Sequence, residues 1–260
     1  MGLRLTRLWR SARRAATRSR YCPALVLGSD GGAARALQRL GFGVVHLDPD
    51  LHPDDDITDP SVMRRVLGWI RSGCLSCVWV EPDTATWLRQ SPAVRSKLYP
   101  RGLPTLANLK ARSVRIANLF QDQYVRVLSE CCYKKVPAIL CHPDASFLWD
   151  GSPCISLANQ SSSIAVFDSC MYAGRVKNRF RLVSWNVKDI DRLSVTCSPV
   201  ASPCRRTQKR HLGELGIPSF DRQMRNAARY PPACILRFAC EKMANSVDSL
   251  RYVSRLIRCV

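Results

Sequence analysis

Glycines and an aspartate, spaced across a strand, a helix and a second strand, are the residues of this chain best suited to hold a nucleoside. Gly31 and Gly32 follow the apolar run 25–27, and Asp48 ends the apolar run 44–47. Glycines at such a turn let the backbone approach a ligand, and the next helix N-terminus offers N–H groups. An aspartate at the second strand end can accept from both ribose hydroxyls. A plain strand–helix–strand unit with a glycine turn is the alternative.

Further acidic residues follow the predicted strands. Asp30, Asp48, Asp56 and Asp83 all fall at or just beyond the carboxyl end of a predicted strand. In open α/β sheets, ligands bind beyond these carboxyl ends. We therefore expect the four aspartates to converge on one crevice.

Alternating strands and helices must position these side chains. Apolar runs predict strands at 25–27, 44–47, 75–80 and 136–140, and helical spacing predicts helices at 33–40, 60–72 and 113–133. Thr58 or Asp59 can cap the helix that begins at Pro60, and Gly73 can end it. This order predicts an α/β protein with a Rossmann-like, mostly parallel twisted sheet and helices on both faces.

The chain length suits one large α/β domain, which we place at residues 25–245 of the 260. A basic segment, 1–24, precedes this domain, and a basic tail, 246–260, follows it. Polar, proline-containing stretches at 88–112 and 196–220 are predicted to be loop excursions from the domain.

Positive charge dominates the chain. Lys and Arg number 40 against 20 Asp and Glu, a formal net charge of +20 that favours nucleic acid as a partner, RNA before DNA. The residues that we expect to contact phosphates are Arg4, Arg7, Arg10, Arg13, Arg14, Arg175, Lys177, Arg179, Arg181, Arg205, Arg206, Lys209 and Arg210. Alternation along 175–181 would put its cations on one face of a strand, although a merely solvated face is the alternative. No apolar run approaches the roughly 18 residues of a membrane span.

The first 24 residues are rich in arginine, contain serine and lack any acidic residue. This composition is typical of a mitochondrial transit peptide, which predicts a mitochondrial location, with the nucleus or another intracellular compartment as the alternative. It is equally the composition of a basic arm that lies on RNA or of a solvated tail.

The 13 cysteines are odd in number and scattered, so we expect them to be mostly reduced in an intracellular compartment. Cys74 and Cys77 are separated by two residues but enter a predicted strand, which favours core packing over zinc binding. Cys131, Cys197 and Cys204 provide no convincing second half of a metal site, and we predict no bound metal.

The order of these segments resembles the cytosine-5 DNA methyltransferases. It is closer still to the shortened methyltransferase-like proteins found in many copies, often beside mobile elements, in dinoflagellates and their relatives. The matching segments, within residues 24–243, are LVLGSDGG with LGFGVVHLD, DITDPSVMRRVLGWIRSGCLSCVWVEPDTATW, CHPDASFLW, FDSCMYAGRVKNRFRL and ARYPPACILRFA. The resemblance implies a methyltransferase fold. It also implies vestigial cofactor contacts at Gly31, Gly32, Asp48, Asp56 and Ile57.

The departures from that family fall on its chemistry. The family's nucleophilic cysteine follows a proline, whereas here Asp83 follows Pro82. A carboxylate is a poor nucleophile toward a pyrimidine ring and a good leaving group, so the covalent step should fail. Cys141 stands where the family has its base-binding glutamate, and His142 replaces an asparagine. Ser29 occupies a position in the cofactor loop where glycine is usual.

The expected function is therefore that of a catalytically inactive methyltransferase-like protein. It would act as a nucleic-acid-binding or structural component, plausibly of a mitochondrial ribonucleoprotein such as the ribosome. No cofactor is expected in that case. One alternative is an active nucleic-acid methyltransferase that uses S-adenosylmethionine with non-cysteine chemistry. The other is a subunit that serves only protein packing in a large organellar complex.

Overall fold

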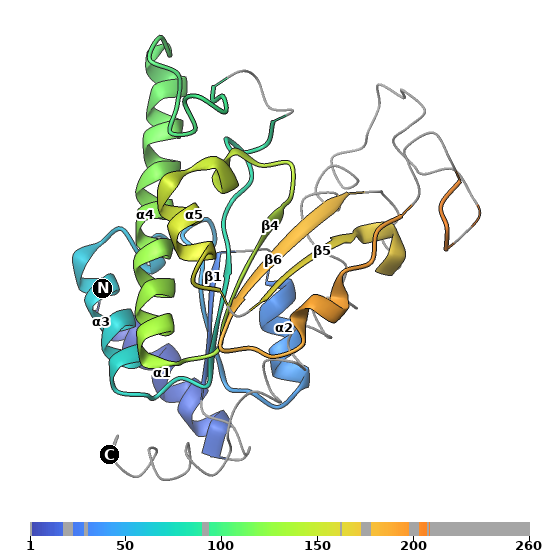
Figure 1. Cartoon of the computed structure of the whole chain (residues 1–260). Coiled ribbons are helices and arrows are strands. Elements are labelled where there is room, and N and C mark those ends of the chain that lie inside the picture. Colours follow the sequence, from blue (N-terminus) through green and yellow to red (C-terminus); the bar gives the residue numbers. More distant parts are fainter. Residues whose placement is uncertain are drawn as a thin grey trace.

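A computed structural model describes residues 2–17, 23–28, 31–89, 94–161, 163–172, 178–197, 203–206 and 208 of the chain (Figure 1). Several predicted features therefore lie outside the described residues. They are Ser29, Asp30, Arg175, Lys177, Lys209, Arg210, most of the excursion 196–220, the ARYPPACILRFA segment and the tail 246–260.

Six described strands form a single sheet in the order β2-β1-β3-β4-β6-β5. They are β1 (Ala24–Gly28), β2 (Val44–Leu47), β3 (Cys77–Glu81), β4 (Ala138–Pro143), β5 (Ser163–Asp168) and β6 (Arg179–Trp185). The first four strands run parallel, whereas β6 lies antiparallel between β4 and β5. The predicted mostly parallel α/β sheet is confirmed.

The helices alternate with the parallel strands along the chain. They are α1 (Gly2–Thr17), α2 (Gly32–Arg39), α3 (Pro60–Arg71), α4 (Asn108–Lys134) and α5 (Ser152–Ala158), with short 3-10 turns η1 (Pro53–Asp55), η2 (Phe147–Asp150), η3 (Ser169–Tyr172) and η4 (Ile190–Leu193). Helix α4 begins five residues before the predicted Ser113, so the loop predicted over 88–112 is shorter than expected. Its first turn carries the exposed Leu109 and has no apolar face that periodicity could detect.

The ends of α3 follow directly from its sequence. The Asp59 carboxylate accepts hydrogen bonds from the backbone N–H groups of Ser61 and Val62, and Pro60 occupies the first turn. These are the usual means of satisfying unpaired donors at a helix start. Gly73 adopts a left-handed φ of 69° just after the helix, as its predicted role requires.

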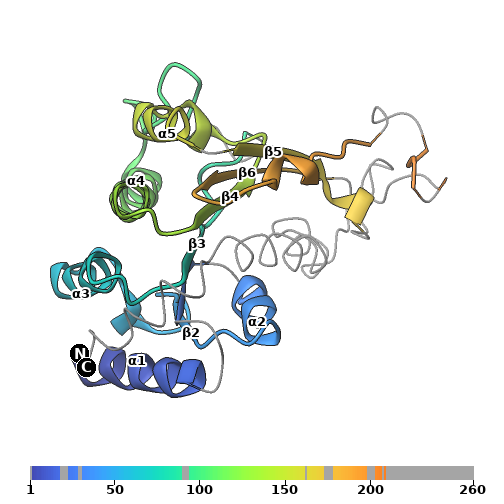
Figure 2. The ribbon, with the colours of Figure 1, turned by 60° about the horizontal axis from the view of Figure 1, so that its bottom comes forward.

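The two faces of the sheet carry different helices (Figure 2). Helices α1, α3, α4 and α5 lie on one face, where they bury a core that includes Leu27, Val80 and Leu140. Helix α2 and the segment 187–193 cover the other face, over Val26 and Trp79. The prediction of helices on both faces is confirmed.

The order in which strands are added to the sheet reverses between β1 and β3. Strand β2 pairs with one edge of β1, and the chain then crosses to pair β3 with the other edge. The crossover helices α2 and α3 consequently lie on opposite faces of the sheet. The carboxyl ends of strands at such a reversal are where open α/β sheets bind ligands.

Helix α1 packs on the domain as part of its fold. The Trp9 ring stacks on Trp69 of α3, with ring centroids 4.6 Å apart and an interplanar angle of 11°. The Arg4 guanidinium donates two hydrogen bonds, at 3.1 and 3.0 Å, to the buried carboxylate of Asp55. Targeting and RNA binding by residues 1–24 stay predictions.

The described cysteines divide into two groups. Cys77 is fully buried in β3, which confirms core packing at that position, and Cys131, Cys141 and Cys154 are also buried thiols. Cys74 is disulfide-bonded and is an exception to the prediction of mostly reduced cysteines. No helix among the described residues is both long and apolar enough to cross a membrane.

Gly43 tests how tightly α1 is docked. A Cβ atom at this position would overlap the carbonyl oxygen of Ala12, so Gly43→Ala should force α1 away from β2. We expect a loss of about 1–3 kcal/mol in the free energy of unfolding, measured by urea titration.

Gly68→Ala is the matched control. A Cβ atom there meets nothing within 4 Å on the exposed side of α3. Replacing a helical glycine with alanine should stabilise the protein by roughly 0.5–1 kcal/mol. Equal effects of the two substitutions would contradict the docking of α1.

Candidate functional site

A cavity of about 320 Å³ lies at the carboxyl ends of β1, β2 and β3. This is the point where the chain direction reverses, and it is where open α/β sheets bind ligands. Its lining consists of Gly28, Asp48, Pro49, Asp50, Glu81, Pro82, Asp83, Ala85, Thr86, Trp87, Ser113, Ile116, Ala117, Phe120 and Tyr124. The volume lies within the range of small-ligand sites.

Gly28 forms the end of β1 at the base of this cavity. Its φ of 71° lies in the left-handed region, and a Cβ atom would overlap the carbonyl oxygen of Glu81 on the neighbouring strand. The Gly28 carbonyl accepts a hydrogen bond of 2.9 Å from Nε2 of His46. Only glycine therefore lets β1 and β3 approach as closely as they do here.

Carboxylates set the electrostatic character of the cavity. Asp48 Oδ1 accepts a hydrogen bond of 3.0 Å from the Asp50 backbone, and burial raises the pKa of Asp48 above its usual value. Glu81 is buried, and its Oε2 accepts from the Trp79 indole at 3.2 Å. Asp83 is exposed at the mouth of the cavity. Among the described residues, no lysine or arginine lines the cavity, so this lining favours neutral or cationic ligands over phosphates.

Aromatic rings supply the remaining wall. Phe120 and Tyr124 project from α4 with ring centroids 6.1 Å apart, and Trp87 comes from the loop after β3. Burial raises the pKa of the Tyr124 hydroxyl, which lies next to Gly28. Such rings can stack on a planar base or contact a cation through their faces.

The structure brings together only part of the predicted cofactor site. Asp48 and Asp83 both line the cavity, which confirms that these two strand ends converge. Asp56 does not line it, because its Oδ1 accepts from the backbone and hydroxyl of Thr58, both at 2.7 Å. Ile57 is buried in the hydrophobic core instead of facing a ligand.

The glycine turn also lies outside the cavity lining. Gly31 precedes α2 with a φ of 80°, and neither Gly31 nor Gly32 lines the cavity. The expected convergence of four aspartates is therefore wrong for Asp56, while Asp30 lies outside the described residues. A local turn at Asp56, closed by its own side chain, competes with ligand binding.

Asp83 and Cys141, which the resemblance places at the positions of the methyltransferases' catalytic residues, differ in their exposure to solvent. Cys141 is fully buried in the core on the same side of the sheet as α2, where burial raises the pKa of its thiol. No cysteine of the described part of the chain lines the cavity. The residue nearest in position to the family's nucleophile is the exposed carboxylate Asp83. Neither residue supplies a thiolate to the cavity.

His142 is a buried histidine inside β4. Its ring lies beside the backbone of Asp83 and Pro143 and meets the Trp149 ring edge-on at 6.3 Å. Neither ring nitrogen forms a hydrogen bond of normal geometry. Burial lowers the pKa of His142 to about 4, so the imidazole is neutral at pH 7.

A buried arginine orders the loop above the cavity. The Arg95 guanidinium lies 3.4 Å from the centre of the Trp87 ring and donates to Thr86, Pro100 and Asn118. No carboxylate among the described residues pairs with it, and burial lowers its pKa to about 10. Sequence reasoning missed Arg95, because its partners are backbone carbonyls and residues distant along the chain.

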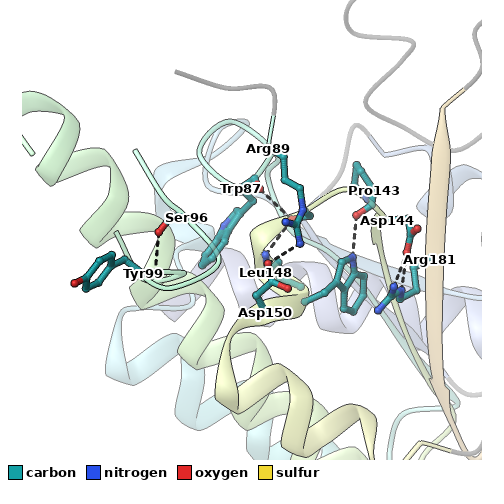
Figure 3. A network of polar contacts seen from close by, with 11 residues as sticks. Trp87, Arg89, Ser96, Tyr99, Pro143, Asp144, Leu148, Asp150 and Arg181 are labelled. Carbon is teal, nitrogen blue, oxygen red and sulfur yellow. Dashed lines mark hydrogen bonds and ion pairs between the residues drawn. The ribbon is translucent and has the colours of Figure 1, made fainter. Parts of the chain in front are cut away.

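Further polar contacts join this loop to the segment after β4 (Figure 3). Arg89 forms an ion pair of 2.6 Å with Asp150, and the Ser146 hydroxyl donates to the Trp87 carbonyl at 3.3 Å. The Trp149 indole donates to the Pro143 carbonyl at 2.8 Å. These bonds hold the end of β4 against the wall of the cavity.

Three of the predicted phosphate contacts form ion pairs with carboxylates. Arg4 pairs with Asp55, Arg179 with Asp168 at 2.9 Å, and Arg181 with Asp144 at 2.7 Å. Arg179 and Arg181 alternate on β6 as predicted, but nearby carboxylates neutralise both charges. The side chains of Arg7, Arg10, Arg14, Arg205 and Arg206 are exposed, and that of Arg13 is half-buried.

Comparison with known proteins adds no family. No protein-family model matches the chain, and no curated protein matches it.

Arg95→Ala tests the loop above the cavity. The substitution leaves the carbonyl groups of Thr86 and Pro100 without their donor, so we expect a loss of about 2–4 kcal/mol in unfolding free energy. Limited proteolysis should also cut the loop faster. The control is Arg101→Ala on the same loop, whose pair with Asp122 is exposed and worth only about 0–1 kcal/mol. Comparable losses would show that Arg95 does not organise the loop.

His142 should make stability depend on pH. Its folded-state pKa of about 4 lies below the ordinary 6.5, so the unfolded chain binds the proton more tightly. The associated stability is complete above pH 6.5 and falls by up to about 3 kcal/mol as pH drops to 4. His142→Asn should flatten this part of the profile in urea titrations at several pH values. A profile unchanged by the substitution would assign the loss to other groups.

Proposed function

We propose that this protein is a methyltransferase-like protein that has lost cysteine-dependent base methylation and binds nucleic acid. The observation that carries the proposal is the cavity at the β1–β3 reversal, which Asp83 lines. The resemblance to the cytosine-5 methyltransferases implies that Asp83 stands where those enzymes have their nucleophilic thiol. The cavity lies where an α/β sheet holds a nucleoside cofactor. Its chemistry no longer supports attack on a pyrimidine ring, since a carboxylate there would leave as readily as it adds.

Nucleic-acid binding is supported by charge that lies away from the cavity. The chain carries a formal net charge of +20, while the cavity itself is acidic. Exposed arginines on α1, including Arg7 and Arg10, can therefore contact a phosphate backbone without entering the cavity. We expect RNA before DNA, within a mitochondrial ribonucleoprotein, as the composition of residues 1–24 indicates.

One observation favours a second candidate, an active S-adenosylmethionine-dependent methyltransferase. The cavity combines Asp48, which can accept from ribose hydroxyls, with the aromatic rings of Phe120 and Tyr124. Carboxylates and rings of this kind suit a nucleoside that carries a positive sulfonium group. This candidate requires a reaction on an exocyclic amine, which needs no cysteine.

The salt dependence of RNA binding tests the first candidate. Each phosphate contact contributes a slope of about −0.7 to −0.9 in log affinity against log salt. The double substitution Arg7→Ala with Arg10→Ala should therefore flatten the slope by about 1.4–1.8 in fluorescence anisotropy titrations with single-stranded RNA.

Arg101→Ala serves as the control for that measurement, because its guanidinium is already paired with Asp122. Its slope should equal that of the unsubstituted protein. A slope near zero in the unsubstituted protein would remove nucleic acid as a partner and favour the protein-packing role.

Cofactor binding separates the two candidates. We expect weak or no binding of S-adenosylmethionine in calorimetry, and no transfer of a labelled methyl group to DNA or RNA. If binding does occur with a dissociation constant in the low micromolar range, Asp48→Asn should weaken it at least about tenfold, by removing a charged acceptor. Asp54→Asn, outside the cavity, should not. Methyl transfer that disappears in Asp83→Ala would establish the second candidate.

A further inference from the structure

Three cysteines from separate segments meet at the outer edge of the sheet, outside the cavity lining. Cys170 lies in η3 directly after β5, Cys197 follows η4, and Cys204 lies in a turn. All three side chains are buried, and their Sγ atoms all lie within 4.8 Å of one another. Figure 1 shows the segment after β6, in orange, returning beside β5 to make this possible.

Backbone hydrogen bonds hold the segment that carries Cys197 against β5. The Asp168 backbone donates to the Val195 carbonyl at 3.0 Å, and the Asp168 carboxylate accepts from the Cys197 backbone at 2.7 Å. The Arg205 backbone N–H lies 3.4 Å from Cys197 Sγ. These contacts hold Cys197 in place beside the end of β5 and next to the turn after Cys204.

The composition of this cluster differs from that of the main core. The two large core clusters consist mainly of alanine, leucine, isoleucine, valine and aromatic side chains, and their few cysteines do not gather into a group of three. Here the three cysteines pack together with Met171 as their partly buried apolar neighbour. Among the described residues, no other group of three His, Cys, Asp or Glu side chains gathers its ligand atoms so closely. A disulfide would use only two of the three sulfurs.

The sulfur spacing suits a tetrahedral zinc ion. A Zn–S distance of about 2.3 Å separates two sulfurs of a tetrahedron by about 3.8 Å. The upper limit of 4.8 Å on the present separations therefore requires a contraction of at most about 1 Å. Thiolates select soft or borderline ions, and hard ions such as Mg²⁺ and Ca²⁺ prefer oxygen ligands.

We propose that Cys170, Cys197 and Cys204 bind one Zn²⁺ ion, with a water molecule as the fourth ligand. Binding breaks three S–H bonds, forms three Zn–S bonds and releases three protons, with no change in oxidation state. The resulting centre carries one net negative charge, which the excess of positive charge in the chain accommodates. The ion would join Cys197 and Cys204 to the end of β5, and so fix the turn that bears Arg205 and Arg206.

Metal titration of the reduced full-length chain tests this site. The protein, treated with a phosphine reductant and freed of metal by chelation, is titrated with Co²⁺ and then with Zn²⁺. We expect sulfur-to-cobalt charge-transfer absorption that saturates at one Co²⁺ per chain and is abolished by one equivalent of Zn²⁺. Elemental analysis of the zinc-loaded protein after gel filtration should give one zinc per chain.

Cysteine variants locate the site. Loss of a residue that only supports a metal ligand typically weakens metal binding by about 10–100-fold. Cys197→Ser removes a ligand itself, so it should weaken Co²⁺ binding by more than that. Cys204→His replaces one sulfur ligand with a nitrogen ligand. This variant should still bind one metal ion per chain, with weaker sulfur-to-cobalt charge-transfer absorption. This variant keeps the test decisive if the serine variant does not fold, as judged by circular dichroism. Cys154→Ser, at a buried cysteine outside the cluster, is the matched control and should bind like the unsubstituted chain.

Three results would overturn the proposal. One is the absence of any cobalt spectrum in the unsubstituted reduced protein. Another is equal metal binding by the Cys197→Ser, Cys204→His and unsubstituted chains with unaltered spectra. The third is a disulfide between two of the three cysteines in protein purified without reductant under argon, identified by mass spectrometry of its peptides.

Discussion

The close approach of β1 and β3 at Gly28 is the constraint on which the rest of the structure depends. The two strands are parallel, but successive strands are added to the sheet on one side of β1 and then on the other. Their carboxyl ends meet where the Glu81 carbonyl occupies the space that a Cβ atom of residue 28 would need. The same junction places α2 and α3 on opposite faces of the sheet. The cavity lies at the strand ends there, with α4 as its helical wall. Fold and candidate site therefore share one origin, a glycine with a left-handed backbone.

Charge is divided within the molecule despite the large positive total. The cavity collects carboxylates and aromatic rings, whereas several arginines on other surfaces are held by single carboxylates. Arg95 is the exception, since it is buried under Trp87 with carbonyl and amide oxygens as its acceptors. A cavity lined by carboxylates therefore coexists with a large positive net charge of the whole chain.

Sequence patterns predicted the parts of the fold that depend on local chemistry. The alternation of apolar runs and helical stretches indicated the parallel sheet, and Asp59 and Gly73 marked the two ends of α3 correctly. The site was only partly predictable. The order of strands and helices predicts which strand ends lie together, but the hydrogen-bond partner of each side chain depends on local backbone geometry. Asp48 points into the cavity, whereas Asp56 turns back to Thr58. No short sequence pattern indicates that His142 is buried in a strand. None indicates that Arg95 contacts residues distant along the chain.

The docking of α1 limits the time at which a receptor could recognise its arginines as a targeting signal. Once folded, Trp9 lies against Trp69 and Arg4 neutralises the buried Asp55, so part of the segment is hidden from any import receptor. Excision of α1 from the finished domain would expose an indole face and strand a carboxylate in the interior. If these residues are a transit signal, as their composition predicts, their recognition has to precede folding, and translocation and folding would then compete for the same sixteen-residue helix.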